Sequence, residues 1–102
     1  GFVTPTEAFA AIAAGAKHLK LFPSSTFTPG YLKAICEVLP KHVSVWAVGG
    51  TGASNLGEWI AAGSRGIGVG GALYRPGDAA ALVGVRAREL TAAWQAVLKE
   101  AT

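Results

Sequence analysis

Patterns typical of helices and of strands alternate along this chain, and the connections between them are short. Helical patterns cover residues 8–14, 31–39, 53–62 and 78–99, and strand patterns cover residues 17–22, 43–48 and 66–69. Strands that are separated by helices usually lie parallel in one sheet, with the helices packed outside it. The sequence therefore predicts an α/β fold built on a parallel sheet, with Asp78 as the capping residue of the last helix.

The predicted sheet is too small for a complete domain. Three parallel strands with four helices would leave the sheet edges and one face poorly covered, and a complete (β/α)8 TIM barrel typically needs at least about 200 residues. The chain has 102 residues and no Met, and it opens on Gly1-Phe2-Val3, which is typical of the middle of a loop. We therefore expect residues 1–102 to be one half of a single TIM-barrel domain in a longer polypeptide.

Composition and charge narrow the class of protein. Apolar residues make up 51% of the chain and charged residues 15%, which is typical of a globular core. The net charge of +3 comes from basic residues scattered between Lys17 and Lys99 without a run, so nucleic acid is not an expected partner. No apolar stretch is long enough to cross a membrane and no signal-peptide pattern is visible. We therefore expect a cytoplasmic protein with no membrane partner.

The single cysteine, Cys36, has no metal-ligand partner at a recognisable spacing. A lone cysteine on a helical pattern is most often a small core residue, and that is the expectation for Cys36. Neither a metal nor a cofactor is predicted.

Lys20 is the strongest candidate for a catalytic residue. It lies in the middle of a predicted strand, where His18, Lys20 and Phe22 share one face and the neighbouring leucines the other. We expect both faces to be covered, and burial lowers the pKa of a lysine until its amine can attack a carbonyl. The pattern indicates Schiff-base chemistry. The alternative is that Lys20 reaches solvent or pairs with a carboxylate, and His18 is expected to be a peripheral or hydrogen-bonded histidine.

Two glycine doublets, Gly49-Gly50 and Gly70-Gly71, each follow a predicted strand. In βα barrels the last two strands often hold a phosphate there, because glycine lets backbone N–H groups approach the anion and a short helix points its positive end at it. We expect that short helix at residues 71–74 and give Arg75, the nearest cation, a smaller part. The alternative is that the glycines only make tight turns.

These residues carry a family resemblance. Leu19-Lys20-Leu21-Phe22-Pro23-Ser24-Ser25, Ala47-Val48-Gly49-Gly50 and Gly68-Val69-Gly70-Gly71-Ala72-Leu73-Tyr74 resemble the lysine strand and phosphate loops of the class I aldolases that act on 2-keto-3-deoxy-6-phospho sugar acids. The resemblance implies the C-terminal half of the barrel, with its last three strands and four helices.

The resemblance also implies roles for single residues. Lys20 is expected to form the imine with pyruvate or the keto acid. The expected substrate-binding residues are Phe22, Pro23 and Val48, and the expected phosphate-binding residues are Gly49, Gly50, Gly70 and Gly71. The family often has a serine where this chain has Gly71, so that hydroxyl contact is missing here.

Within the family, the chain resembles the galactonate branch. Gluconate-type members usually show Phe-Pro-Ala-Glu and Thr-Gly-Gly, whereas this chain has Phe22-Pro23-Ser24-Ser25 and Val48-Gly49-Gly50. Loss of a threonine hydroxyl at position 48 removes a hydrogen bond to the sugar acid and can change which C4 epimer is accepted. The resemblance implies cleavage of 2-dehydro-3-deoxy-6-phosphogalactonate to pyruvate and glyceraldehyde 3-phosphate by a homotrimer, a step in the breakdown of sugar acids.

The family's general base, a glutamate, and its carboxylate-binding arginine have no matching positions here, so the 102 residues alone are expected to be inactive. Three alternatives stay open at this point. The chain can belong to the gluconate-epimer aldolase of the same family, to another phosphate-binding barrel enzyme that resembles thiamine phosphate synthase, or to a non-catalytic half-barrel that binds phosphate.

Overall fold

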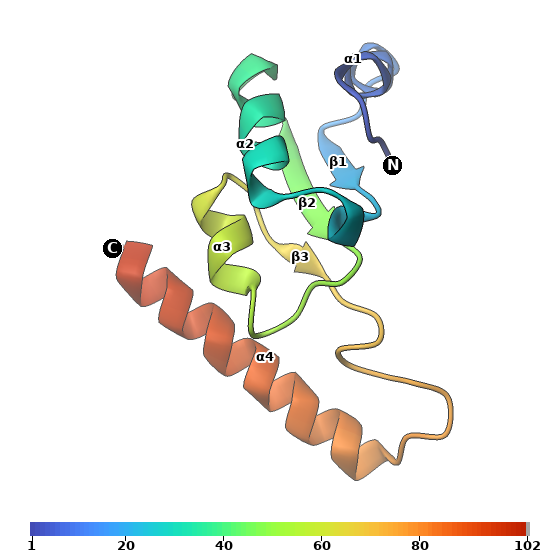
Figure 1. Cartoon of the computed structure of the whole chain (residues 1–102), viewed down its shortest axis with the longest axis vertical. Helices are drawn as coiled ribbons and strands as arrows, with labels where there is room; N and C mark the ends of the chain where they lie inside the picture. The colour runs from blue at the N-terminus through green and yellow to red at the C-terminus, as the bar shows by residue number, and fades with distance from the viewer. Residues whose placement is uncertain (102) are drawn as a thin grey trace.

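The computed structural model of the chain describes residues 1–101 (Figure 1). The helices are α1 (Pro5–Ala13), α2 (Pro29–Val38), α3 (Leu56–Ala61) and α4 (Ala80–Ala101), and a single 3-10 turn, η1, covers Ser24–Thr26. The strands are β1 (His18–Leu21), β2 (Ser44–Val48) and β3 (Ile67–Gly68). Helices and strands therefore alternate in the order expected from the sequence.

The three strands form one parallel sheet in the order β1-β2-β3. Lys20 pairs with Trp46 in this register, and Ala47 pairs with Ile67. On the other side of β1, Phe2 forms a parallel bridge with Leu21, and its backbone N–H donates to the carbonyl of Lys20 over 2.9 Å. The residues before α1 thus already belong to the sheet, on the side of β1 away from β2.

The hydrophobic core lies on one face of this sheet. Leu19 and Leu21 of β1 and Val45 and Ala47 of β2 are buried. They pack against buried residues of α1, α2 and α3, which are Ala8, Leu32, Ile35 and Trp59. In Figure 1, α2 passes in front of β2, and the long α4 runs below the sheet and lies beside α3. The helices therefore cover the leucine face of β1.

The opposite face of the sheet contributes nothing to this core. On it, Trp46 and Val48 are half-buried, and His18 and Lys20 are exposed. The prediction that Lys20 is buried is therefore wrong for the described chain. The reason is that burial of both faces requires cover on each, and the described helices pack their buried residues on one face only.

Two helix starts follow from a Thr-Pro pair. The hydroxyl of Thr4 accepts the N–H of Glu7, whose carboxylate in turn accepts the N–H of Thr4, and Pro5 takes the first helical position of α1. Thr28 accepts the N–H of Tyr31 in the same way, so α2 begins two residues before the predicted start. Both helices thus begin where the sequence supplies a capping oxygen.

Two details of the segment between β3 and α4 were predicted wrongly. Residues 71–73 form one turn and no helix, closed by N–H groups of Leu73 and Tyr74 that both donate to the carbonyl of Gly70. The turn cannot continue because Pro76 has no N–H to donate and Gly77 has a φ of 94°. Asp78 does not cap α4, which begins at Ala80.

Candidate active site

The end of β1 brings Lys20 and Phe22 together on the open face of the sheet. The Lys20 Nζ lies 5.4 Å from the centre of the Phe22 ring, and the ring is 51% exposed. His18, two residues before Lys20 on the same face of β1, accepts a hydrogen bond at Nδ1 from the indole N–H of Trp46 over 3.3 Å. The expectation of a hydrogen-bonded histidine is confirmed. Within residues 1–101, the Lys20 amine contacts the Phe22 ring and forms no hydrogen bond or ion pair.

Ser24 joins the loop after β1 to the end of β2. Its side chain is completely buried, its hydroxyl donates to the carbonyl of Leu21 over 2.7 Å, and it accepts the N–H of Val48 over 3.0 Å. The peptide bond between Phe22 and Pro23 is cis. Because one hydroxyl satisfies groups on both strand ends, the position of Val48 relative to the lysine strand is fixed.

The backbone conformation and the packing of the loop after β2 both require glycine at positions 49 and 50. Gly49 and Gly50 have φ values of 102° and 68°, in the region that disfavours side chains. A Cβ atom on Gly50 would lie 2.7 Å from the Cβ of Ser25, and one on Gly49 would lie 3.2 Å from the ring of Phe22. These glycines therefore let the loop after β2 pack directly on the loop after β1.

The second doublet has no such requirement. Neither Gly70 nor Gly71 has a positive φ. A Cβ on Gly70 would have no atom within 4 Å, and one on Gly71 would meet only the Nε of Arg75 at 3.7 Å. The chain therefore leaves open space at two positions where its own packing and backbone would accept a side chain.

Glycines of both doublets, Gly50 from the first and Gly70 and Gly71 from the second, border one hollow with a volume of about 370 Å³. Its lining residues are Gly50, Thr51, Gly52, Ser54, Gly70, Gly71, Ala72 and Arg75. The structure thus brings three of the four predicted phosphate-binding glycines together at the hollow, and Gly49 is not among its lining residues. Arg75, expected from the sequence as the nearest cation with a smaller part, lines the same hollow.

Two polar side chains hold the loop after β2 in place at this hollow. The amide of Asn55 donates to the carbonyl of Gly50 and accepts the N–H of Gly52, each over 2.9 Å. The buried hydroxyl of Thr51 donates to the carbonyl of Gly68 in β3. The conformation of the loop after β2 is therefore held by hydrogen bonds within the chain itself.

Val48 lies on the same face as Lys20, since Lys20 pairs with Trp46 and side chains two residues apart along a strand share a face. A Cβ on Gly68 would lie 2.8 Å from a methyl group of Val48, so this side chain extends across β3. Pro23 follows Phe22 in the sequence and is half-buried. Phe22 and Pro23 thus follow β1, the strand of Lys20, and Val48 ends the neighbouring strand β2.

The rest of the described chain offers little competing chemistry. A larger cavity of about 650 Å³ lies between β3, α3 and α4, and apolar side chains such as Leu56, Ile60 and Trp94 line most of it. Burial raises the pKa of the half-buried Cys36 thiol, which packs against the core. Among residues 1–101, no three His, Cys, Asp or Glu side chains are grouped for a metal ion, and no helix is long and apolar enough to span a bilayer.

Comparisons with known proteins agree with this arrangement. The chain is 54% identical over 78 residues to the 2-dehydro-3-deoxy-6-phosphogalactonate aldolase of Escherichia coli strain K12, a match that covers 76% of this chain and 38% of that protein. It is 46% identical over 97 residues to a probable 2-dehydro-3-deoxy-6-phosphogalactonate aldolase of Rhizobium meliloti strain 1021, covering 95% of this chain and 46% of the relative.

The chain is similar to both aldolases over most of its own length. It spans less than half the length of either of them. Among solved structures, a native KDPGal structure matches 97% of this chain and 48% of its own, with a TM-score of 0.94 and 44% identity. A chain of a cube-shaped, porous protein cage designed by fusing symmetric oligomeric domains matches 98% of this chain and 37% of its own, with a TM-score of 0.96 and 45% identity.

No family model matches the chain. The likeness to the KDPGal structure nevertheless confirms the predicted fold class, an α/β arrangement that corresponds to about half of a barrel. Because the match to the native KDPGal structure covers nearly the whole chain, it includes most of the β1, β2 and β3 loops described above.

Sequence reasoning missed the polar side chains that support the site. Ser24, Thr51 and Asn55 act through hydrogen bonds between segments that are distant in the sequence, and no local pattern reveals such partners. For Ser24 a signal was present, since it stands where gluconate-type sequences have alanine. A hydroxyl next to a strand end that replaces an apolar residue is a reason to look for buried backbone groups.

Proposed function

We propose that this chain supplies the imine-forming lysine and the phosphate site of a class I aldolase that cleaves 2-dehydro-3-deoxy-6-phosphogalactonate to pyruvate and glyceraldehyde 3-phosphate. The observation that carries the proposal is the pairing of a free lysine amine at one strand end with an open, glycine-lined hollow at the next two. The similarity to the curated aldolases supports the same reaction.

Lys20 has the central part in the proposed reaction. Its neutral amine attacks the C2 keto carbon of the sugar acid, and loss of water gives a protonated imine. When a base removes the proton of the C4 hydroxyl, the C3–C4 bond breaks and its electron pair moves into the imine, which becomes an enamine. Glyceraldehyde 3-phosphate leaves, C3 is protonated, and water releases pyruvate and restores the amine.

Lys20 is exposed in the described chain, whereas imine-forming lysines are typically desolvated. We propose that the remaining strands of a barrel cover the open face of the sheet and bury the Lys20 amine, as nucleophilic lysines require. The bridge from Phe2 to Leu21 supports this proposal, because it places a parallel pairing on the side of β1 away from β2. This chain is then the C-terminal half of the domain, and the absent half supplies the general base and the carboxylate-binding arginine.

Phe22 and Val48 are proposed to set the shape of the substrate pocket. The Phe22 ring lies beside the amine of Lys20 and can pack on the pyruvyl portion of the substrate. Val48 has no hydrogen-bonding group to offer at C4, so a pocket built around it does not select the gluconate hydroxyl configuration. We also propose that the complete enzyme is a homotrimer and that it is cytoplasmic.

The test compares kcat/KM of the complete protein for the galactonate and gluconate epimers, with pyruvate release as the readout. We expect the galactonate epimer to be cleaved at least as well as the gluconate epimer, and Lys20→Ala to abolish both reactions. A large gluconate preference would instead assign the gluconate-type activity. Phosphate binding without cleavage of either epimer would favour a thiamine-phosphate-synthase-like enzyme or a non-catalytic half-barrel.

A further inference from the structure

Arg75 lies in the loop between β3 and α4 and borders the hollow of the two glycine doublets. Its Nε is the one atom near a Cβ built on Gly71, at 3.7 Å, and its side chain lines the hollow with Gly50 and Gly70. Within residues 1–101, its guanidinium makes none of the described hydrogen bonds or ion pairs. Among the described residues, a cation whose guanidinium is not hydrogen-bonded therefore stands at the edge of the space that the glycines leave open.

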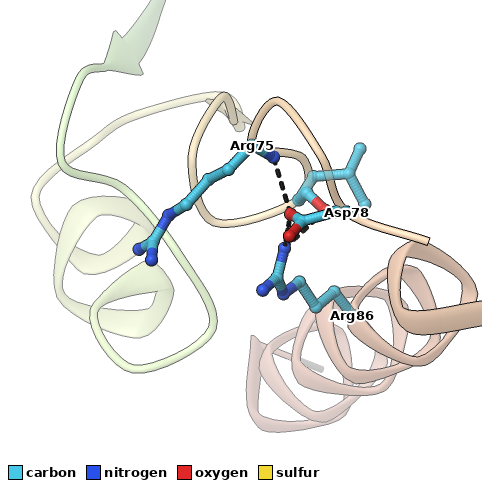
Figure 2. A network of polar contacts seen from close by, with 4 residues as sticks. Arg75, Asp78 and Arg86 are labelled. Atoms are coloured by element: carbon cyan, nitrogen blue, oxygen red, sulfur yellow. Dashed lines mark hydrogen bonds and ion pairs between the residues drawn. The ribbon is translucent and has the colours of Figure 1, made fainter.

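The carboxylate of Asp78 is close enough to pair with Arg75, but it forms an ion pair with Arg86 instead. It also accepts the backbone N–H of Arg75 over 2.7 Å. Figure 2 shows the Arg75 side chain extending to the side away from Asp78, toward the ribbon of the segment after β2. The hydrogen bond from Arg86 is the main reason that the pKa of Asp78 is lowered, so this carboxylate stays charged and engaged.

Arg86 also fixes the loop from a second point. Its guanidinium donates to the carbonyl of Leu73 over 3.3 Å, so one side chain of α4 holds both the start and the end of the turn that carries Arg75. The backbone of Arg75 is tied to Asp78 while its guanidinium remains available. The loop is thus braced in a form that points a positive charge at the hollow.

We propose that Arg75 binds the phosphate group of a phosphomonoester in this hollow, and that the Asp78–Arg86 pair is a positioning device that keeps the Arg75 guanidinium free for it. The proposal rests on the proposed function for the identity of the phosphate ligand. A guanidinium presents paired donors that match two phosphate oxygens, and the backbone of Gly70 and Gly71 lines the same hollow. The site then combines a backbone cradle with one side-chain cation.

The proposal can be measured without any catalytic step. We would titrate the complete protein with glycerol 3-phosphate by calorimetry, with glycerol as the control for the unphosphorylated part of the ligand. Because hydrogen bonds to charged groups contribute roughly 1.5–3 kcal/mol, Arg75→Ala should weaken glycerol 3-phosphate binding by about tenfold or more. Arg75→Lys should weaken it less, since the charge remains and the paired geometry is lost.

The Asp78–Arg86 ion pair gives a second expectation for phosphate binding. Arg86→Gln leaves the Asp78 carboxylate without its partner, so Arg75 is drawn to it and phosphate binding should weaken about threefold or more. The double variant Asp78→Asn/Arg86→Gln removes the competing charge and should bind glycerol 3-phosphate more tightly than Arg86→Gln alone. A purely structural role of Arg86 would leave the double variant as weak as the single one or weaker.

The outcomes separate this proposal from the aldolase proposal. If pyruvate forms an adduct with Lys20 while Arg75→Ala binds glycerol 3-phosphate as the wild type does, the role of Arg75 is refuted and the aldolase proposal stands. If glycerol 3-phosphate binding depends on Arg75 but no adduct forms, the phosphate site stands and the aldolase is refuted. Absence of glycerol 3-phosphate binding in the wild type refutes the role of Arg75 directly.

Discussion

Alanine substitutions in the two glycine doublets should have opposite consequences, although both doublets follow a strand and contribute glycine to the lining of the same hollow. At Gly50, an alanine would have to adopt a φ of 68° and place its Cβ 2.7 Å from the Cβ of Ser25. The left-handed conformation alone costs about 1–2 kcal/mol and a forced overlap about 1–3 kcal/mol more. Gly50→Ala should therefore lower the free energy of unfolding by at least about 2 kcal/mol.

At Gly70, the same substitution meets no atom of the chain within 4 Å and requires no unusual backbone conformation. We expect Gly70→Ala to change the free energy of unfolding by less than about 0.5 kcal/mol, as surface substitutions usually do. Its methyl group stands in the space proposed for the phosphate, so the KM for the phosphorylated substrate should rise about tenfold. The condensation of pyruvate with unphosphorylated glyceraldehyde should be unchanged.

The assays are urea unfolding and steady-state kinetics of the complete protein. A matched control separates strain from overlap at Gly50, because Ser25→Gly removes the atom that the new methyl group would meet. The double variant Ser25→Gly/Gly50→Ala should recover part of the lost stability, leaving the conformational cost. The reasoning is refuted if Gly70→Ala destabilises the protein as much as Gly50→Ala, or if it leaves the KM of the phosphorylated substrate unchanged.

Two further substitutions test local interactions. Ser24→Ala removes the acceptor of the Val48 N–H and should lower the free energy of unfolding by about 1–3 kcal/mol. The control Ser25→Ala should change the free energy of unfolding by less than about 0.5 kcal/mol. Equal effects of the two substitutions would contradict the bridging role of Ser24. Thr4→Ala removes the cap of α1 and should cost about 1 kcal/mol. Hydrogen bonds from Thr4 and Val3 lower the pKa of Glu7, so the stabilisation by this carboxylate is present above its unfolded-state pKa and is lost as the pH falls through its folded-state pKa. Unfolding curves at neutral and acidic pH check this, and a Thr4→Ala effect of the same size at both would argue against it.

The sequence predicted the order of helices and strands well because each element has a local signal. The Thr4-Pro5 and Thr28-Pro29 pairs begin helices, and β-rich runs that end at glycine doublets predict strands. The short helix at residues 71–74 was wrong because only the hydrogen bonds to the Gly70 carbonyl decide between one turn and a helix. Such alternatives differ by interactions that the residue pattern does not specify.

The site was predictable in part. Strand periodicity placed Lys20 and Phe22 on one face, and the structure brings them within 5.4 Å. Periodicity could not reveal that this face is open, since burial depends on what packs against it. The role of Arg75 also required the fold, because its access to the hollow follows from Asp78 being occupied by Arg86.

The proposed chemistry depends on one bond between substrate and protein, and that bond can be trapped. Borohydride reduces an imine to a stable secondary amine, so the complete protein treated with pyruvate and borohydride should lose activity and gain the mass of one reduced pyruvyl group. Peptide mass spectrometry should locate this group on Lys20. An adduct on the exposed Lys17 instead, or no adduct at all, would contradict the central claim that Lys20 forms the imine.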